Sequence, residues 1–126
     1  MIALSKMDDR PSEMIHLAMI RGKMCEMLAE KSGLKPLESF FTVGLFSALD
    51  ILMERDIETI IAPLPLSDEV ENALLKHEGI LGEALKCALA YEVADFDNIS
   101  FQNLTENDFF IANVEAVSWA NMAIDV

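Results

Sequence analysis

The chain reads FFTVGLFSALD over residues 40–50, LPLSDEV over residues 64–70 and KHEG over residues 76–79. The first segment lies in a predicted helix from about Ser39 to Glu54, whose polar side chains are confined to a wedge of about 140° at 100° per residue. A helix that is apolar over most of its circumference belongs in the middle of a helical bundle. Gly44, followed one turn later by Ala48, allows a neighbouring backbone to come close.

The next two segments predict a turn and then a helical hairpin. The Pro63-Leu64-Pro65 segment favours an extended turn, because proline disfavours helical backbone in the residue before it. Ser67 is a suitable N-cap for a new helix, which has two acidic residues in its first turn. We predict that this helix ends at Gly79 and that the next helix runs from about Leu81 to Val93.

Helical patterns also cover the two ends of the chain. A first long helix is predicted from Pro11, a favourable first-turn residue, to a stop at Ser32-Gly33. A last helix is predicted from a capping pair, Thr105 and Asp108, to about Ile124. Its small-residue seam consists of Ala112, Ala116, Ala120 and Ala123. Residues 95–98 are predicted as a loop, and no segment has a sustained period of two, so we predict an all-α fold, a bundle of about five helices in one region over residues 1–126.

Size and charge narrow the class of protein. At 126 residues the chain suits one domain with a real hydrophobic core. Its apolar fraction is 52% and its mean hydropathy is +0.29, but no run approaches the roughly 18 apolar residues of a membrane span. The first residues do not form a secretory signal, so we expect a cytoplasmic protein. A net charge of −13 repels phosphates and anionic lipids, so we expect no nucleic-acid partner and no membrane partner.

The sequence offers few groups for catalysis. A metal hydrolase of the HD type needs several His and Asp ligands, including an adjacent His-Asp pair. This sequence has only His16 and His77, and the nearest approximation to such a pair is His77-Glu78. A histidine at a helix end is more often a core or capping residue than a ligand. We therefore predict no catalytic, cofactor-binding or metal-binding residues and no cofactor.

The two cysteines, Cys25 and Cys87, lie outside any C-x-x-C pair and within apolar helical patterns. A free thiol in such surroundings behaves as a small hydrophobe. We expect both thiols to be buried and reduced, with a disulfide or redox role as the alternative.

Arg21 falls on the apolar face of the first predicted helix, one turn after Leu17 and one turn before Cys25. Such an arginine needs a partner, and we expect a structural ion pair with a carboxylate of a neighbouring helix. The candidate partners are Asp50, Glu78 and Glu92. The alternative is contact with a ligand in a cleft.

The aromatic residues Tyr91 and Trp119 are expected to be core residues with one polar tip, with anchors of a partner interface as the alternative. The acidic surface is expected to be a solvated face, although it could also steer a basic partner.

Together with RGKMCE at residues 21–26 and AYE at residues 90–92, the opening segments resemble the C-terminal half of HDOD domains, the HD-related output domains of bacterial signalling proteins. The resemblance runs from about Pro11 to Ala120 and is closest to the subgroup that follows an EAL cyclic-di-GMP phosphodiesterase domain. It implies an HD-like helical fold without the metal-binding and catalytic residues of HD enzymes. It also implies that the chain is the C-terminal part of an HDOD domain from a larger protein.

The function expected from this resemblance is a non-enzymatic regulatory module that acts through protein contacts in cyclic-di-GMP or stress signalling. Its partners would include an EAL domain in the full-length protein. We also expect apolar helix faces to permit a homodimer. The alternatives are an HD-like metal-dependent phosphohydrolase, a ligand-sensing domain with an unrecognised pocket, or an oligomerisation domain.

Overall fold

The computed structural model describes residues 2–124, with side chains for residues 12–123. Within this range every regular element is helical, which confirms the all-α prediction. The elements are α1 (Ile2–Lys31), α2 (Leu37–Phe46), α3 (Leu49–Met53), α4 (Ile57–Ile61), α5 (Asp68–Lys76), α6 (Gly79–Glu92), the 3-10 turn η1 (Phe96–Asn98) and α7 (Glu106–Ile124). Five of the described helices are nine residues or longer, as the sequence predicted.

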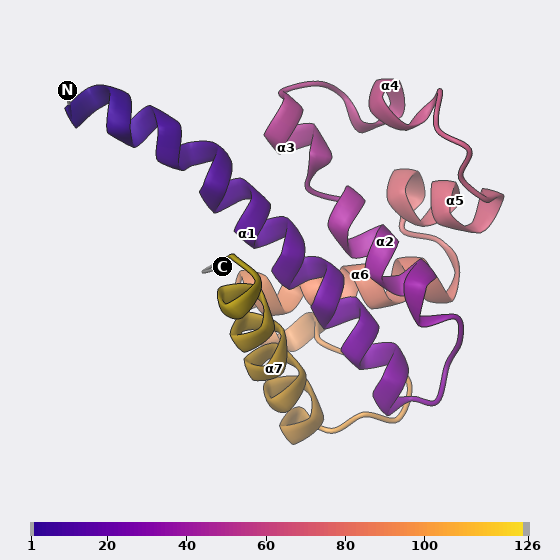
Figure 1. The fold of residues 1–126 in the computed structure, drawn as a ribbon. Coiled ribbons are helices and arrows are strands. Elements are labelled where there is room, and N and C mark those ends of the chain that lie inside the picture. The colour runs from indigo at the N-terminus through magenta and orange to yellow at the C-terminus, as the bar shows by residue number, and fades with distance from the viewer. Residues whose placement is uncertain (1, 125–126) are drawn as a thin grey trace.

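The helix α1 organises the bundle (Figure 1). Its C-terminal half packs between α2 and α7 and also contacts α6, whereas its N-terminal half extends away from the other helices. The helices α5 and α6 are consecutive, pack against each other and both contact α2, and the short α3 and α4 connect α2 to α5. In the described part of the chain, no helix combines the length and the apolar character needed to cross a lipid bilayer.

The core is one cluster to which all the longer helices contribute. Met24, Cys25 and Leu28 of α1 pack with Phe40 and Val43 of α2 and with residues of α5 and α6. The predicted alanine seam of α7 is largely confirmed, because three of its members are completely buried and only the last is exposed. Small side chains on this face allow α7 to lie close to α1.

Two predicted helix starts are confirmed in detail. The Ser67 hydroxyl accepts a hydrogen bond from the Val70 amide at 3.3 Å. Before α7 the pairing is reciprocal: the Thr105 amide donates to Asp108 Oδ2 at 2.8 Å, and the Asp108 amide donates to Thr105 Oγ1 at 3.2 Å. The amide of Thr105 holds the pKa of the Asp108 carboxyl below its usual range. Such caps depend on residues three positions apart, so they can be recognised in the sequence.

The predicted helix Ser39–Glu54 is wrong as a single element, because α2 ends at Phe46 and α3 begins at Leu49. At the break, the Ser47 hydroxyl donates to the carbonyl oxygen of Gly44 at 2.6 Å. A serine that bonds a carbonyl of the preceding turn competes with the backbone ladder and favours a bend. The apolar pattern continues through the break because α2 and α3 both pack against α1.

The predicted boundary at Gly79 is also wrong. The helix α5 ends at Lys76, and His77 is its C-cap in the left-handed conformation, with φ of 55°. Gly79 instead begins α6, two residues before the predicted start. A Cβ atom at Gly82 would overlap the backbone of His77, so the early end of α5 depends on a close contact between α6 and the turn.

Two smaller predictions also need correction. The first helix begins at Ile2, so Pro11 lies inside α1 and not in its first turn. An interior proline removes one backbone hydrogen bond without ending this long helix. The segment predicted as a loop at residues 95–98 contains the short 3-10 turn η1.

Candidate functional site

Arg21 is a buried charged residue, with 8% of its surface exposed. Its guanidinium forms hydrogen bonds with residues of other helical segments. Its Nε donates to Oε1 of Glu92 at 2.8 Å, and its Nη2 donates to Oε2 at 2.9 Å. Its Nη1 reaches the carbonyl and hydroxyl oxygens of Ser47 at 3.3 and 3.4 Å. Of the three candidate partners, the structure therefore contains the pair with Glu92. The guanidinium connects α1, the end of α6 and the α2–α3 junction.

Two glycines bring the backbones of α1 and α2 together beside this ion pair. A Cβ atom at Gly44 would overlap the backbone of Arg21 and would lie 2.6 Å from the Cα of Gly22. A Cβ atom at Gly22 would lie 3.0 Å from the carbonyl oxygen of Phe41. The sequence-based expectation of a close approach at Gly44 is confirmed. This crossing holds Ser47 within reach of the Arg21 guanidinium.

An open groove of about 570 Å³ passes over the Arg21–Glu92 pair and also contains His77, Lys86 and Asp95. Burial lowers the pKa of His77, and the positive charge of Lys86 lowers it further. Both effects favour the uncharged form of His77, and Arg21 is neutralised by Glu92. Two Lys or Arg side chains line this groove. Arg21 is paired with Glu92, whereas Lys86 forms no ion pair with any residue whose side chain is described.

The two histidines have separate positions in the fold. Nε2 of His16 lies 2.7 Å from Oδ1 of Asn121 and links α1 to α7, whereas His77 caps α5. Across residues with described side chains, no group of three or more His, Cys, Asp or Glu has a spacing that could hold a metal ion. The histidines thus occupy two separate positions, His16 at a helix interface and His77 at a helix C-cap.

Both cysteines are buried and free, as predicted. Burial, together with a smaller effect of the nearby Cys87, raises the pKa of Cys25 to about 12, and the charge of Arg21 opposes these two effects. Burial also raises the pKa of Cys87 to about 11, against the effect of a backbone hydrogen bond from Ser100. A nucleophilic thiolate needs a lowered pKa, so both thiols have the character of core residues.

Trp119 and Tyr91 make different kinds of contact. The Trp119 ring packs edge-on against Phe41, with centroids 5.7 Å apart, and Lys23 Nζ lies 5.1 Å from its centroid. Trp119 is half-buried between helices and lies outside the core cluster, so its predicted place in the core is wrong, whereas Tyr91 packs against that cluster, close to the prediction. Tyr91 packs edge-on against Phe96, again with centroids 5.7 Å apart, although 65% of Phe96 is exposed.

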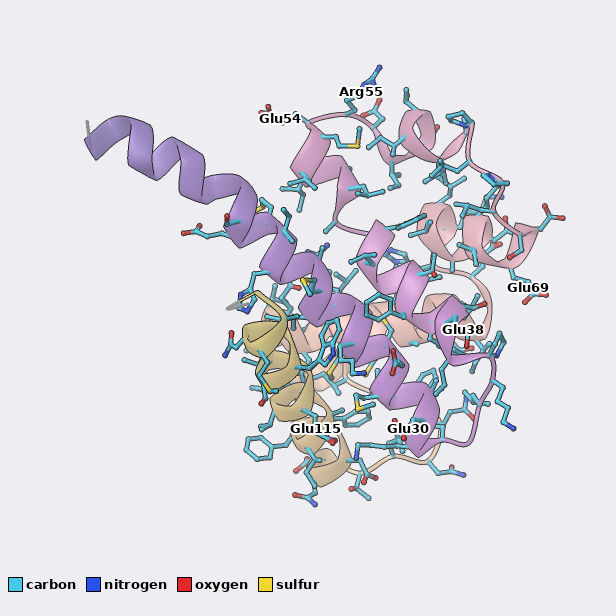
Figure 2. The ribbon with its side chains drawn as sticks, viewed as in Figure 1. Glu30, Glu38, Glu54, Arg55, Glu69 and Glu115 are labelled. Carbon is cyan, nitrogen blue, oxygen red and sulfur yellow. The ribbon has the colours of Figure 1, made fainter. Side chains whose placement is uncertain are left out.

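Sequence reasoning missed a pocket of about 310 Å³ between α6, η1 and α7, which we call the aromatic pocket. It is lined by Tyr91, Phe96, Ile99, Glu106 and Phe109. Other carboxylates, including Glu30, Glu69 and Glu115, are exposed and lie on separate helices (Figure 2). The signal that could have pointed to the pocket is an aromatic residue between two acidic ones, in a segment predicted as a loop.

Comparison with known proteins finds two curated relatives. The chain is 34% identical over 115 residues to the uncharacterized protein YuxH of Bacillus subtilis (strain 168), covering 90% of this chain and 28% of YuxH. It is 33% identical over 117 residues to the cyclic di-GMP phosphodiesterase CdgJ of Vibrio cholerae serotype O1, covering 88% of this chain and 27% of CdgJ. The chain therefore spans about a quarter of the length of these relatives. No family model and no solved structure matches it.

Proposed function

We propose that the chain is a non-enzymatic regulatory module of cyclic-di-GMP signalling that acts through protein contacts. In this proposal it is the C-terminal part of an HDOD domain, joined to an EAL domain in a longer protein. The observation that carries the proposal is the 33% identity to CdgJ, which is named as a cyclic di-GMP phosphodiesterase and of which this chain spans only 27%. A segment of that size fits a role beside the catalytic part of such an enzyme.

The positions of the histidines support a role without catalysis. A metal hydrolase of the HD type needs several histidine and aspartate side chains that converge on the same ion. Here His16 lies beside Asn121 at the α1–α7 interface, and His77 is held in a left-handed cap at the end of α5. Each histidine is committed to a different structural position.

The way the helices are joined supports a contact role. Arg21 connects three parts of the bundle, and the glycine crossing places the backbones of α1 and α2 in direct contact. Both features restrict relative movement of the helices. A rigid bundle presents its exposed side chains in a fixed arrangement, which a contact module needs for specific binding.

Turnover of cyclic di-GMP tests the catalytic part of the proposal. The purified chain is treated with a chelator, supplied with Mn²⁺ or Mg²⁺ and incubated with cyclic di-GMP, and products are separated by chromatography. We expect no product under any of these conditions. Reproducible, metal-dependent turnover that disappears in His77→Ala would show that the chain is an enzyme.

A chimera tests the regulatory part. The matching segment of CdgJ is replaced by this chain, and turnover is compared with that of CdgJ and of CdgJ lacking the segment. We expect the chimera to differ from the deletion, and we expect substitutions at exposed positions to change turnover while the helical circular dichroism is retained. Equal turnover by the chimera and the deletion would count against regulation by this chain.

Ligand sensing is a second candidate, favoured by the open groove that contains Lys86. The groove has limited capacity for an anion, because Arg21 already donates to both carboxylate oxygens of Glu92. Calorimetry with cyclic di-GMP separates the two functions. Saturable binding that is lost in Lys86→Ala would favour sensing over protein contact.

A further inference from the structure

Positive charge is absent from the last third of the sequence. All nine Lys and Arg residues and both histidines occur at or before Lys86, so residues 87–126 contain no basic side chain. The acidic residues of this segment are Glu92, Asp95, Asp97, Glu106, Asp108, Glu115 and Asp125. The end of α6, η1 and α7 all belong to this segment. The charged side chains that these elements contribute are therefore all acidic, although Glu92 and Glu115 are paired with Arg21 and Lys31.

The aromatic pocket lies within this acidic segment. Tyr91 comes from α6, Phe96 from η1, and Glu106 and Phe109 from α7. The Tyr91 and Phe96 rings meet at an interplanar angle of 82°, so the pocket has ring surfaces in two orientations. Glu106 is exposed, and no ion pair involves it among the residues with described side chains. The pocket thus combines apolar walls with an accessible carboxylate.

Such a combination favours a cationic side chain over other occupants. The methylene stem of arginine or lysine packs on aromatic rings, and the cation is attracted to the ring faces. A carboxylate can accept two hydrogen bonds from one guanidinium. A purely apolar occupant would remove water from Glu106 without replacing its hydrogen bonds, which is unfavourable. An anionic occupant would be repelled by the acidic residues on either side of Phe96.

An exposed apolar stripe on α7 continues from this pocket. Phe110 is 57% exposed and follows Glu106 by one helical turn, so the two residues lie on the same face. Val114, one turn further, is 48% exposed. This face lies opposite the buried alanines that pack towards α1. A partner that fills the pocket with a cation can therefore place apolar side chains on the adjoining stripe.

We propose that the aromatic pocket binds an arginine or lysine side chain of a partner protein, and that apolar residues beside that cation pack on Phe110 and Val114. The proposal rests on the protein-contact function above and specifies the chemistry of the partner. Charge complementarity favours a basic partner, because a second copy of this chain would bring another net charge of −13.

Binding of a short peptide tests the proposal. The probe is acetyl-Leu-Leu-Arg-Leu-Leu-amide, and the control peptide has citrulline, the neutral isostere, in place of arginine. Resonances of the ¹³C,¹⁵N-labelled full chain are followed by NMR during titration. We expect saturable shifts at Tyr91, Phe96 and Phe110 with a Kd of about 1 mM, and binding about fivefold weaker for the citrulline peptide.

Matched variants separate specific binding from general attraction to an acidic protein. Glu106→Gln is expected to weaken binding of the arginine peptide about fivefold, whereas Glu69→Gln, with the same loss of charge on α5, is expected to leave it unchanged. Figure 2 shows Glu69 on the opposite side of the view from α7. Phe96→Ala removes an exposed ring and is expected to weaken both peptides.

Several outcomes would overturn the proposal: equal binding of the two peptides, equal effects of Glu106→Gln and Glu69→Gln, or no shifts at the pocket up to about 10 mM peptide, tenfold above the expected Kd. These outcomes can be distinguished from failure of the proposed function. A regulated chimera with no peptide binding would keep the contact function and reject this pocket. Peptide binding by the chain, combined with a chimera whose turnover equals that of the deletion, would keep this pocket and reject the regulatory function.

Discussion

Arg21→Ala is expected to destabilise the protein because it leaves Glu92 without its partner. The substitution removes hydrogen bonds of 2.8 and 2.9 Å to Glu92 and the longer contacts with Ser47. The Glu92 side chain is 27% exposed, so its carboxylate can regain part of its hydration. We therefore expect the free energy of unfolding to fall by about 3 kcal/mol, the low end of the range for breaking a buried ion pair. For a domain of this length, that corresponds to a decrease in Tm of about 10 °C.

Urea denaturation followed by circular dichroism measures this loss. Arg21→Lys should recover only part of it, because an ammonium group cannot donate in the same bidentate geometry. The control is Lys31→Ala, since the Lys31–Glu115 pair is longer, at 3.6 Å, and Glu115 is 51% exposed. We expect the control to cost less than about 1 kcal/mol. If Arg21→Ala cost no more than the control, the structural role of Arg21 would be rejected and contact with a ligand would become the better explanation.

Other consequences can be tested separately. Gly44→Ala should lower stability by about 3 kcal/mol or more, because the added methyl overlaps the α1 backbone; an unchanged thermal melt would contradict the glycine crossing. Cys25 and Cys87 should resist an aromatic disulfide reagent at pH 8, and rapid labelling of the native protein would show that the thiols are accessible. In the folded protein the pKa of Cys25 is about 12, above the ordinary value of 9.0. The protonated Cys25 thiol therefore contributes its full stabilisation below pH 9, and this stabilisation is lost as the pH rises towards 12. Urea denaturation at several pH values across that range measures the loss. The exposed apolar side chains of Ile15, Ile51 and Met53 should support a weak homodimer, favoured by salt because each copy carries a charge of −13; light scattering that shows a monomer at millimolar concentration and high salt would exclude it.

Helix caps were predictable from sequence, whereas most details that depend on contacts between distant segments were not. Ser67 and Thr105 bond to groups three residues away, so their roles follow from spacing alone. The break after Phe46 depends on a serine that also lies beside Arg21, which comes from another helix. The cap at His77 likewise depends on the space left by Gly82. Hydrophobic periodicity predicts which face of a helix is buried, but it does not predict which residues of other helices contact that face.

In the candidate site, too, some features were predictable from the sequence and others depended on contacts between distant segments. The position of Arg21 on an apolar face predicted a buried ion pair, but three carboxylates remained possible until the fold placed Glu92 opposite it. The aromatic pocket was not predicted, because its residues come from α6, η1 and α7 and share no sequence pattern. Phe96 lies in a segment predicted as a loop, and although large aromatic side chains are usually buried, this one is mostly exposed.

Trp119 is the only tryptophan of the chain, and it lies where α7 meets Phe41 of α2 and Lys23 of α1. Its fluorescence emission is therefore sensitive to separation of any of these three helices. Tyr91, the only tyrosine, forms a wall of the aromatic pocket. The protein thus carries one intrinsic chromophore where α1, α2 and α7 meet and another in the pocket that we propose binds a partner. Spectroscopy can follow opening of the bundle and occupation of the pocket without an attached dye.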